Sequence, residues 1–145
     1  MYSRESIYQA LFDSLKEIGG LNVERRLRHW DDVPSEEQPY LGISQAKETA
    51  DTVTGLPTAW LWQLDLYLYT TTMSPDTPST KLNTFLDAIC AKINTVHPVT
   101  GKNVLGFPVD VQYCRVQGTI ETDEGTLGDQ AVAIIPVVIY VVQQP

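Results

Sequence analysis

The sequence predicts an α+β fold in which one mixed or antiparallel β-sheet carries two main α-helices packed on one face. Two stretches place apolar residues at helical spacing, one long stretch alternates between apolar and mixed positions, and residues 131–142 form a continuous apolar run. The expected order is helix, strands, helix and two further strands joined by a turn. At 145 residues the chain is expected to form a single domain.

The first helix is expected to run from Ser3 or Arg4 to about Ile18. Gly19 and Gly20 then supply the left-handed stop that commonly ends a helix. The apolar stripe of this helix recurs every three or four residues and consists of Ile7, Leu11, Leu15 and Ile18.

Two strands are expected next. The stretch VERRLRHW at residues 23–30 alternates, which predicts an edge or half-exposed strand rich in arginine. A further strand is expected to start at Pro39 and to pass through Ile43. Residues 45–54 are polar and are expected to form a loop or one arm of a hairpin.

The clearest strand is expected at residues 58–72, which contain AWLWQLDLYLY. At about 3.3 Å per residue it would reach about 45 Å, long enough to project beyond its own domain. One face of this strand is wholly apolar and consists of Trp60, Trp62, Leu64, Leu66 and Leu68. The opposite face is mixed and consists of Ala59, Leu61, Gln63, Asp65, Tyr67 and Tyr69.

The second helix is expected to begin after Thr77 as its cap, with Pro78 at its first position. Its apolar stripe consists of Leu82, Phe85, Leu86, Ile89, Ile93 and Val96. Residues 109–122 are then expected to form a strand with Val109, Val111 and Tyr113 on one side. The sequence Asp123-Glu124-Gly125 predicts the turn that leads into the last strand, residues 131–142.

The continuous apolar run at residues 131–142 predicts a strand that is covered on both faces. The two helices can cover one face of the sheet, so we expect a neighbouring copy or a partner to cover the other. Pro136 cannot donate to a strand ladder and marks an edge, a bulge or a bend. The alternative is that the segment between Gln45 and Thr58 folds over this second face.

Composition argues against several classes of protein. A net charge of −8 and a pI near 4.5 disfavour nonspecific binding to nucleic acid, although this sign of charge suits a surface past which DNA slides. The apolar run is about half the length of a membrane span. Cys90 and Cys114 are expected to be reduced core thiols.

No catalytic signature stands out, and we expect neither an enzyme nor a bound cofactor or metal. His29 lies among arginines, where it is poorly placed to hold a metal, and His97 precedes a proline at the expected end of a helix, where contact with the helix dipole is its ordinary role. Adjacent carboxylates at residues 31–32, 36–37 and 123–124 fall in expected turns, where solvated turn chemistry is the ordinary role; a weak divalent-ion site there is the alternative.

Several segments taken in order resemble the tail terminator, or tail completion, proteins of long-tailed bacteriophages. The first helix is followed by VERRLRHWDDVPSEEQPYLGI, then by AWLWQLDLYLY, then by LNTFLDAICAKI and finally by VQGTIETDEGTLGDQAVAIIPVVIYV. Together these segments span nearly the whole chain. They are features of fold and pattern, and none is a catalytic motif.

The resemblance implies a non-enzymatic minor tail protein of the virion that assembles in the host cytoplasm. Such proteins form a ring, expected to be a homohexamer, that caps the head-proximal end of the tail tube, stops tube polymerisation and provides the surface for head joining. The implied partners are other copies of the chain, the tail tube protein and a head-tail connector or neck protein. DNA would pass through the lumen without specific binding.

A ring needs two different complementary patches on each subunit. For the first patch we expect the arginine-rich strand, with Arg25, Arg26, Arg28 and Trp30. For the second we expect the mixed face of the long strand with its neighbouring acidic turns, namely Asp65, Tyr67, Tyr69, Asp123 and Glu124.

Two other functions stay open from the sequence. The chain could be another neck or tail-tube component of the same particle. In a different class, it could be a small enzyme or ligand-binding α+β domain with a pocket around Trp60, Trp62 and Tyr113.

Overall fold

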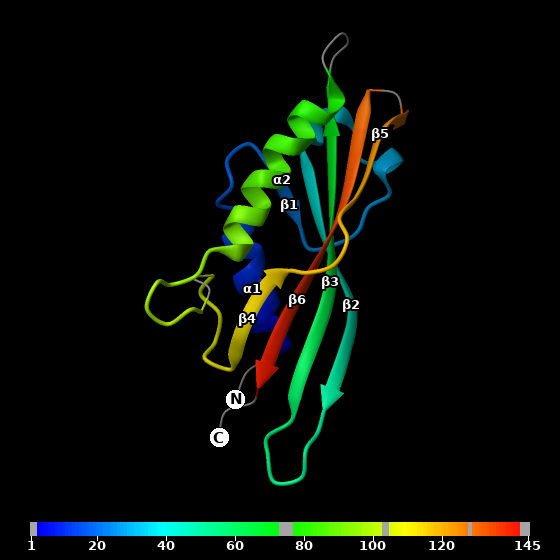
Figure 1. Cartoon of the computed structure of the whole chain (residues 1–145). Helices are drawn as coiled ribbons and strands as arrows, with labels where there is room; N and C mark the ends of the chain where they lie inside the picture. Colours follow the sequence, from blue (N-terminus) through cyan, green and yellow to red (C-terminus); the bar gives the residue numbers. More distant parts are fainter. Residues whose placement is uncertain (1–2, 73–76, 103–104, 128, 143–145) are drawn as a thin grey trace.

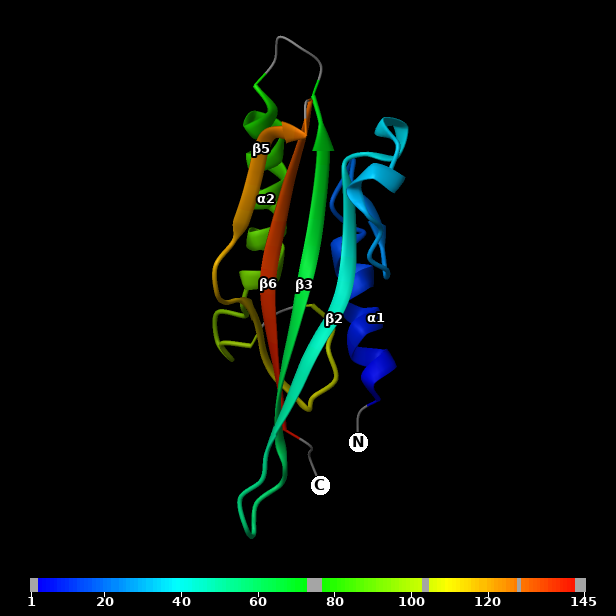
Figure 2. The same cartoon turned by 90° about the vertical axis from the view of Figure 1, so that its right-hand side faces the viewer.

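The computed structural model describes residues 3–72, 77–102, 105–127 and 129–142 of the chain. Two α-helices and a six-stranded mixed sheet form two layers, with both helices on one face of the sheet (Figures 1 and 2). The predicted α+β class is therefore confirmed. We call the helix-covered side the inner face and the opposite side the outer face.

The sheet consists of six strands in the order β1-β2-β3-β6-β4, and β5 also pairs with β6. Only β1 and β2 are parallel, and all other pairs are antiparallel. The strands are β1 (Asn22–Glu24), β2 (Tyr40–Asp51), β3 (Ala59–Thr71), β4 (Val111–Val116), β5 (Glu121–Leu127) and β6 (Gln130–Val142).

The two central strands, β3 and β6, pair along their whole lengths. Beyond β6, the border of the sheet is shared by two strands, because β4 pairs with residues 137–141 and β5 with residues 130–134. One row across the sheet runs through Glu24, Gly42, Tyr67, Ile134 and Glu121. The short strand β1 and the strand β5 are therefore opposite borders of the same half, which we call the upper half.

The helices are α1 (Arg4–Leu15) and α2 (Pro78–Asn94). Ser3 caps α1, since its hydroxyl oxygen accepts from the backbone N–H of Ser6 at 3.1 Å. Pro78 occupies the first turn of α2 as expected, although the side chain of Thr77 makes no capping hydrogen bond. Turns follow Leu15, so α1 ends three residues before the expected Ile18.

The main core lies between the helices and the inner face. The ring of Tyr8 in α1 stacks on Trp62 of β3, with centroids 5.3 Å apart. The apolar face expected for the long strand is largely confirmed, because Trp62, Leu64, Leu66 and Leu68 are buried. Alternate residues of β6 complete this core, namely Ala131, Ala133, Ile135, Val137, Ile139 and Val141.

The prediction of a strand at residues 23–30 is wrong except for residues 23 and 24, which belong to β1. Regular pairing stops at Glu24, and a short 3-10 helix forms at Trp30–Asp32. The backbone leaves the sheet because it finds other partners: the carbonyl oxygens of Arg26 and Arg28 accept from the hydroxyls of Tyr40 and Tyr69. These bonds replace the strand ladder that the alternating pattern suggested.

Two expectations near the C-terminal hairpin also need correction. Residues 123–125 do not form a turn, because they belong to β5, in which Asp123 and Glu124 pair with β6. The strand expected at residues 109–122 is two strands, and Val109 is outside both and 71% exposed. A register shift between Val111 and Tyr113 places their side chains on opposite faces.

The lower half of the molecule carries a projecting hairpin made of residues 45–63, which we call the arm. Figure 2 shows it extending beyond both helices. Residues 45–57 of the arm are exposed. The long strand thus projects beyond the helix-covered part of the domain, as expected. The alternative prediction, that residues 45–58 fold over the outer face, is wrong.

Candidate assembly surface

Residues 25–38 pass over the upper half of the outer face, and we call them the crossing segment. The hydroxyl of Tyr40 donates to the Arg26 carbonyl at 2.8 Å, and that of Tyr69 donates to the Arg28 carbonyl at 2.6 Å. Gly42 makes the close approach possible, since a Cβ there would lie 2.7 Å from the Arg26 carbonyl oxygen. The segment is therefore fixed to β2 and β3 by specific contacts.

A small second core lies beneath the crossing segment. The rings of Tyr40 and Tyr69 stack with centroids 5.5 Å apart, and Val33 packs on them at 2% exposure. Burial raises the pKa of Tyr40 to about 12. Tyr69, expected at a subunit surface, is 4% exposed and serves this core.

The three arginines expected in one patch have different surroundings. Arg25 forms an ion pair with Glu5 of α1, and the hydrogen bond from Arg25 lowers the pKa of the Glu5 carboxyl. The arginine pairs of the crossing segment are thus made within the chain.

Arg28 is more covered than Arg26. Its guanidinium contacts Glu24 at 3.2 Å and Glu37 at 3.1 Å, with a side chain 16% exposed. Arg26 also contacts Glu24, at 3.1 Å, but its side chain is 68% exposed. Of the three, Arg26 is the arginine that presents its charge to solvent.

The structure brings together residues that the sequence assigned to different patches. Trp30 of the crossing segment and Asp123 of β5 line the same groove of about 340 Å³. Val132 and Ile134 of β6 lie between them, and Glu121 and Thr122 complete the lining. We call this the upper groove. Its apolar floor continues into the second core, which Trp30, Tyr67 and Val132 flank.

Asp65 lies farther down the outer face and does not join Asp123. It lines a separate hollow of about 410 Å³ with Gln63, Pro136 and Val138. Glu124 is exposed on β5, one residue beyond the upper groove. Asp123 pairs with Val132 of the outer face and Glu124 with Ala131 of the inner face, so the acidic residues of the expected second patch fall into three places.

An aromatic cluster on the lower outer face was missed by sequence reasoning. Tyr113 of β4 stacks on Tyr140 of β6 with centroids 5.2 Å apart, and the Arg115 guanidinium lies 4.4 Å from the Tyr113 ring centre. In the sequence, Tyr140 alternates with Ile139 and Val141, and this pattern is a signal that could have placed it on the outer face. The register shift that turns Tyr113 outward carries no such signal.

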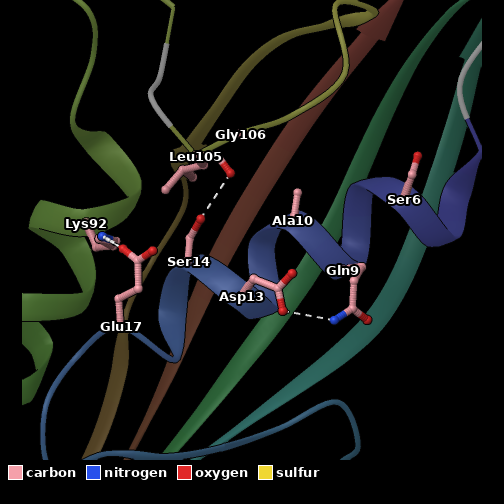
Figure 3. Close-up of a pocket in the computed structure, with 9 residues that line it drawn as sticks. All are labelled: Ser6, Gln9, Ala10, Asp13, Ser14, Glu17, Lys92, Leu105 and Gly106. Atoms are coloured by element: carbon pink, nitrogen blue, oxygen red, sulfur yellow. Dashed lines mark hydrogen bonds and ion pairs between the residues drawn. The ribbon is translucent and has the colours of Figure 1, made fainter.

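A hollow larger than the upper groove lies on the other side of the molecule, beside α1 (Figure 3). It is a shallow polar groove of about 520 Å³ between α1 and residues 105–106. The Ser14 hydroxyl donates to the Leu105 carbonyl at 3.0 Å, and Lys92 of α2 pairs with Glu17 (Figure 3). These contacts tie the helices to the loop before β4.

The pocket considered around Trp60, Trp62 and Tyr113 does not form. Trp62 is fully buried against Tyr8, and Tyr113 lies on the opposite face of the sheet. Cys90 and Cys114 are both free, as expected, and Cys114 is buried. Within residues 3–72, 77–102, 105–127 and 129–142, no three potential metal ligands gather in one place.

The two histidines have ordinary backbone partners. The His29 ring accepts from the N–H of Asp31 at 3.2 Å, and the His97 ring accepts from the N–H of Val99 at 3.1 Å. Both therefore help to order turns. In the described part of the chain, no helix combines the length and the apolar character that crossing a membrane requires.

Comparison with known proteins gives no family. No family model matches the chain, and no curated protein matches it. Among solved structures, one that carries no functional name aligns over 98% of this chain and 94% of its own, with 16% identity and a TM-score of 0.45. A likeness of this degree does not bear on function.

Proposed function

We propose that this protein is a structural component of a phage tail, a tail terminator that assembles into a ring with other copies of itself. The observation that carries the proposal is the unequal cover of the sheet. Both helices pack on the inner face, whereas the crossing segment covers only the upper part of the outer face within the described residues.

The uncovered part of the outer face is rich in apolar and aromatic side chains. It includes Leu61, Ile134, Pro136, Tyr113 and Tyr140, each only partly covered by its neighbours in the sheet. Aromatic and aliphatic side chains mixed with a few charges are typical of interfaces between proteins. A second copy of the chain is the cover that we propose.

The arm gives a second reason to expect partners. It holds Val53 and Leu56, which are 51% and 63% exposed, beyond the reach of the helices. A two-stranded hairpin gains little stability by itself, so a long projecting one is usually supported by a contact. In a ring, the arm would contact a neighbouring copy or the end of the tail tube.

The ring itself, its six copies and its partners follow from the resemblance of the sequence to tail terminators. Two different patches that meet head to tail generate a closed ring when the rotation closes. The partners would be the tail tube protein on one side and a head-tail connector on the other, with DNA in the lumen. A net charge of −8 would limit adhesion of that DNA.

Mass measurement tests the proposal. Native mass spectrometry and light scattering should give an oligomer of about six copies, alone or after mixing with tail tube protein, and added protein should shorten the tubes that form. A chain that stays monomeric at every concentration and leaves tube length unchanged would contradict the proposal. Formation of long tubes by this chain alone would indicate a tube component instead.

A further inference from the structure

The crossing segment presents one apolar and one cationic side chain together at the border formed by β1 and β2. Leu27 is 49% exposed, and the Arg26 side chain beside it is 68% exposed. The carbonyls on either side of Leu27 are held by the hydroxyls of Tyr40 and Tyr69. We call Arg26 and Leu27 the corner, and its backbone is fixed before any partner arrives.

The upper groove offers the matching chemistry. Its floor is apolar at Val132 and Ile134, and the indole of Trp30 forms one wall. Glu121 and Asp123 supply carboxylates on the β5 side, and no ion pair among the described residues includes either of them. The groove therefore suits an aliphatic side chain accompanied by a cation.

The corner and the upper groove face opposite borders of the sheet. The crossing segment contacts β2 at Arg26, then β3 at Arg28, and reaches β5 and β6 at Trp30. The row that joins Glu24 of β1 to Glu121 of β5 places both borders at the same level. Copies placed side by side would bring a corner toward a groove.

The high exposure of Leu27 distinguishes the corner from the other apolar residues of the upper half. Among the described residues, the other large apolar side chains with high exposure are in the arm or in the segments beside the loop before β4. They are Val53, Leu56, Val96, Val99 and Val109. Leu27 is the one that lies beside an open border of the upper half.

We propose that Arg26 and Leu27 of one copy seat in the upper groove of the next copy, with Arg26 toward Glu121 and Asp123. This contact is heterologous, so repetition gives a ring or a filament and not an isolated dimer. The inference rests on the proposed function, because it names the surfaces through which the copies associate.

The proposed contact is tested by reversing the charge of Arg26 or of Asp123 alone, and then by exchanging the two charges in a double variant. Arg26→Glu alone and Asp123→Lys alone should each weaken self-association about tenfold, because each places like charges together. The double variant should recover most of the affinity, since the opposite charges then meet again. Leu27→Ser should also weaken association about tenfold through loss of apolar contact.

Lys102→Glu is the matched control, because it makes the same charge change at an exposed residue of a distant loop. It should leave association within about twofold of the natural protein. Circular dichroism and thermal unfolding of every variant check that the fold is kept. Association is measured by sedimentation of the chain alone and in the presence of tail tube protein.

The outcomes separate the contact from the proposed function. If the natural chain assembles but the single reversals behave like Lys102→Glu, the contact is wrong and the ring stands. If the reversals abolish tube binding while the oligomer keeps its size, the groove receives the tube protein and not a second copy. If the natural chain never associates with itself or with tubes, both proposals fail.

Discussion

The two faces of the sheet differ in how they are covered, although both are apolar. The inner face packs against α1 and α2, and its β6 residues are fully or almost fully buried. The outer face has a small core under the crossing segment, and below it most side chains are only partly covered, although Val138 is buried at 4% exposure. Neighbouring residues of one strand thus contribute to stability on the inner side and, in the proposed assembly, to contact with partners on the outer side.

The difference explains the apolar run that the sequence contains near its end. A strand with one solvated face usually alternates apolar and polar residues. In β6, Val132, Ile134 and Tyr140 alternate with buried residues but are themselves apolar. The outer face therefore has a composition suited to being covered, which is what the proposed assembly supplies.

The largest expected effect compares two adjacent isoleucines of β6. Ile135 is 0% exposed on the inner face, whereas Ile134 is partly exposed in the upper groove. Ile135→Ala should lower the free energy of unfolding by about 3 kcal/mol, and Ile134→Ala by about 1 kcal/mol. Urea unfolding at a concentration where the chain is monomeric measures both. Equal losses would mean that the two faces are packed alike.

A second effect depends on pH and on the inner face. Burial raises the pKa of the Cys114 thiol to about 12, whereas an unfolded thiol titrates near 9.0. Since the unfolded chain releases this proton first, the free energy of unfolding should fall by about 2 to 3 kcal/mol between pH 8 and pH 11 through this group.

The variant Cys114→Ala isolates this contribution. Tyr8 and Tyr40, whose pKa values burial also raises to about 12, remain in both proteins and act in the same direction. Unfolding free energy measured at pH 8 and pH 11 should therefore fall less in the variant. Parallel losses in the two proteins would show that the thiol is not protected from ionisation by the fold.

A third effect concerns the attachment of the crossing segment to the outer face. Gly42→Ala would place a Cβ 2.7 Å from the Arg26 carbonyl oxygen, so the segment must shift. We expect a loss of about 2 kcal/mol in unfolding free energy. Gly19→Ala is the control, because a Cβ there meets nothing within 4 Å, and it should change stability by less than about 0.5 kcal/mol.

The smallest effect on stability is expected in the arm. Leu56 is 63% exposed, so Leu56→Ser should change the free energy of unfolding by less than about 0.5 kcal/mol. If the arm contacts a partner, the same variant should still reduce association with tail tube protein or with other copies. A stability loss of several kcal/mol would instead show that the arm folds back onto its own domain.

Sequence reasoning found the elements whose patterns are local. The stripes of α1 and α2 and the alternation of β3 are regular, and tertiary contacts reinforce them. The mixed face of β3 was also correctly separated from its apolar face. These predictions succeed because helical and strand periodicities are properties of the segment itself.

The crossing segment could not be predicted in this way. Its alternating residues suit a strand, but Tyr40 and Tyr69 bind its carbonyls from positions far along the sequence. Asp123 and Glu124, followed by a glycine, suit a turn, yet they pair with β6 and belong to β5. The meeting of Trp30 with Asp123 depends on both events, and so the upper groove has no sequence signal.

Pro136, opposite Asp65 in the middle of β6, has a consequence for solubility. Its nitrogen has no hydrogen to donate, and its carbonyl accepts from Gln117 at 3.1 Å, just after β4 ends at Val116. The chain then passes Gly118, where a Cβ would lie 3.1 Å from the proline ring, before β5 begins. The border strand is therefore interrupted, and β4 and β5 are both short. A short edge strand is a poor template for pairing with a strand of another chain, so this interruption disfavours aggregation through the sheet edge.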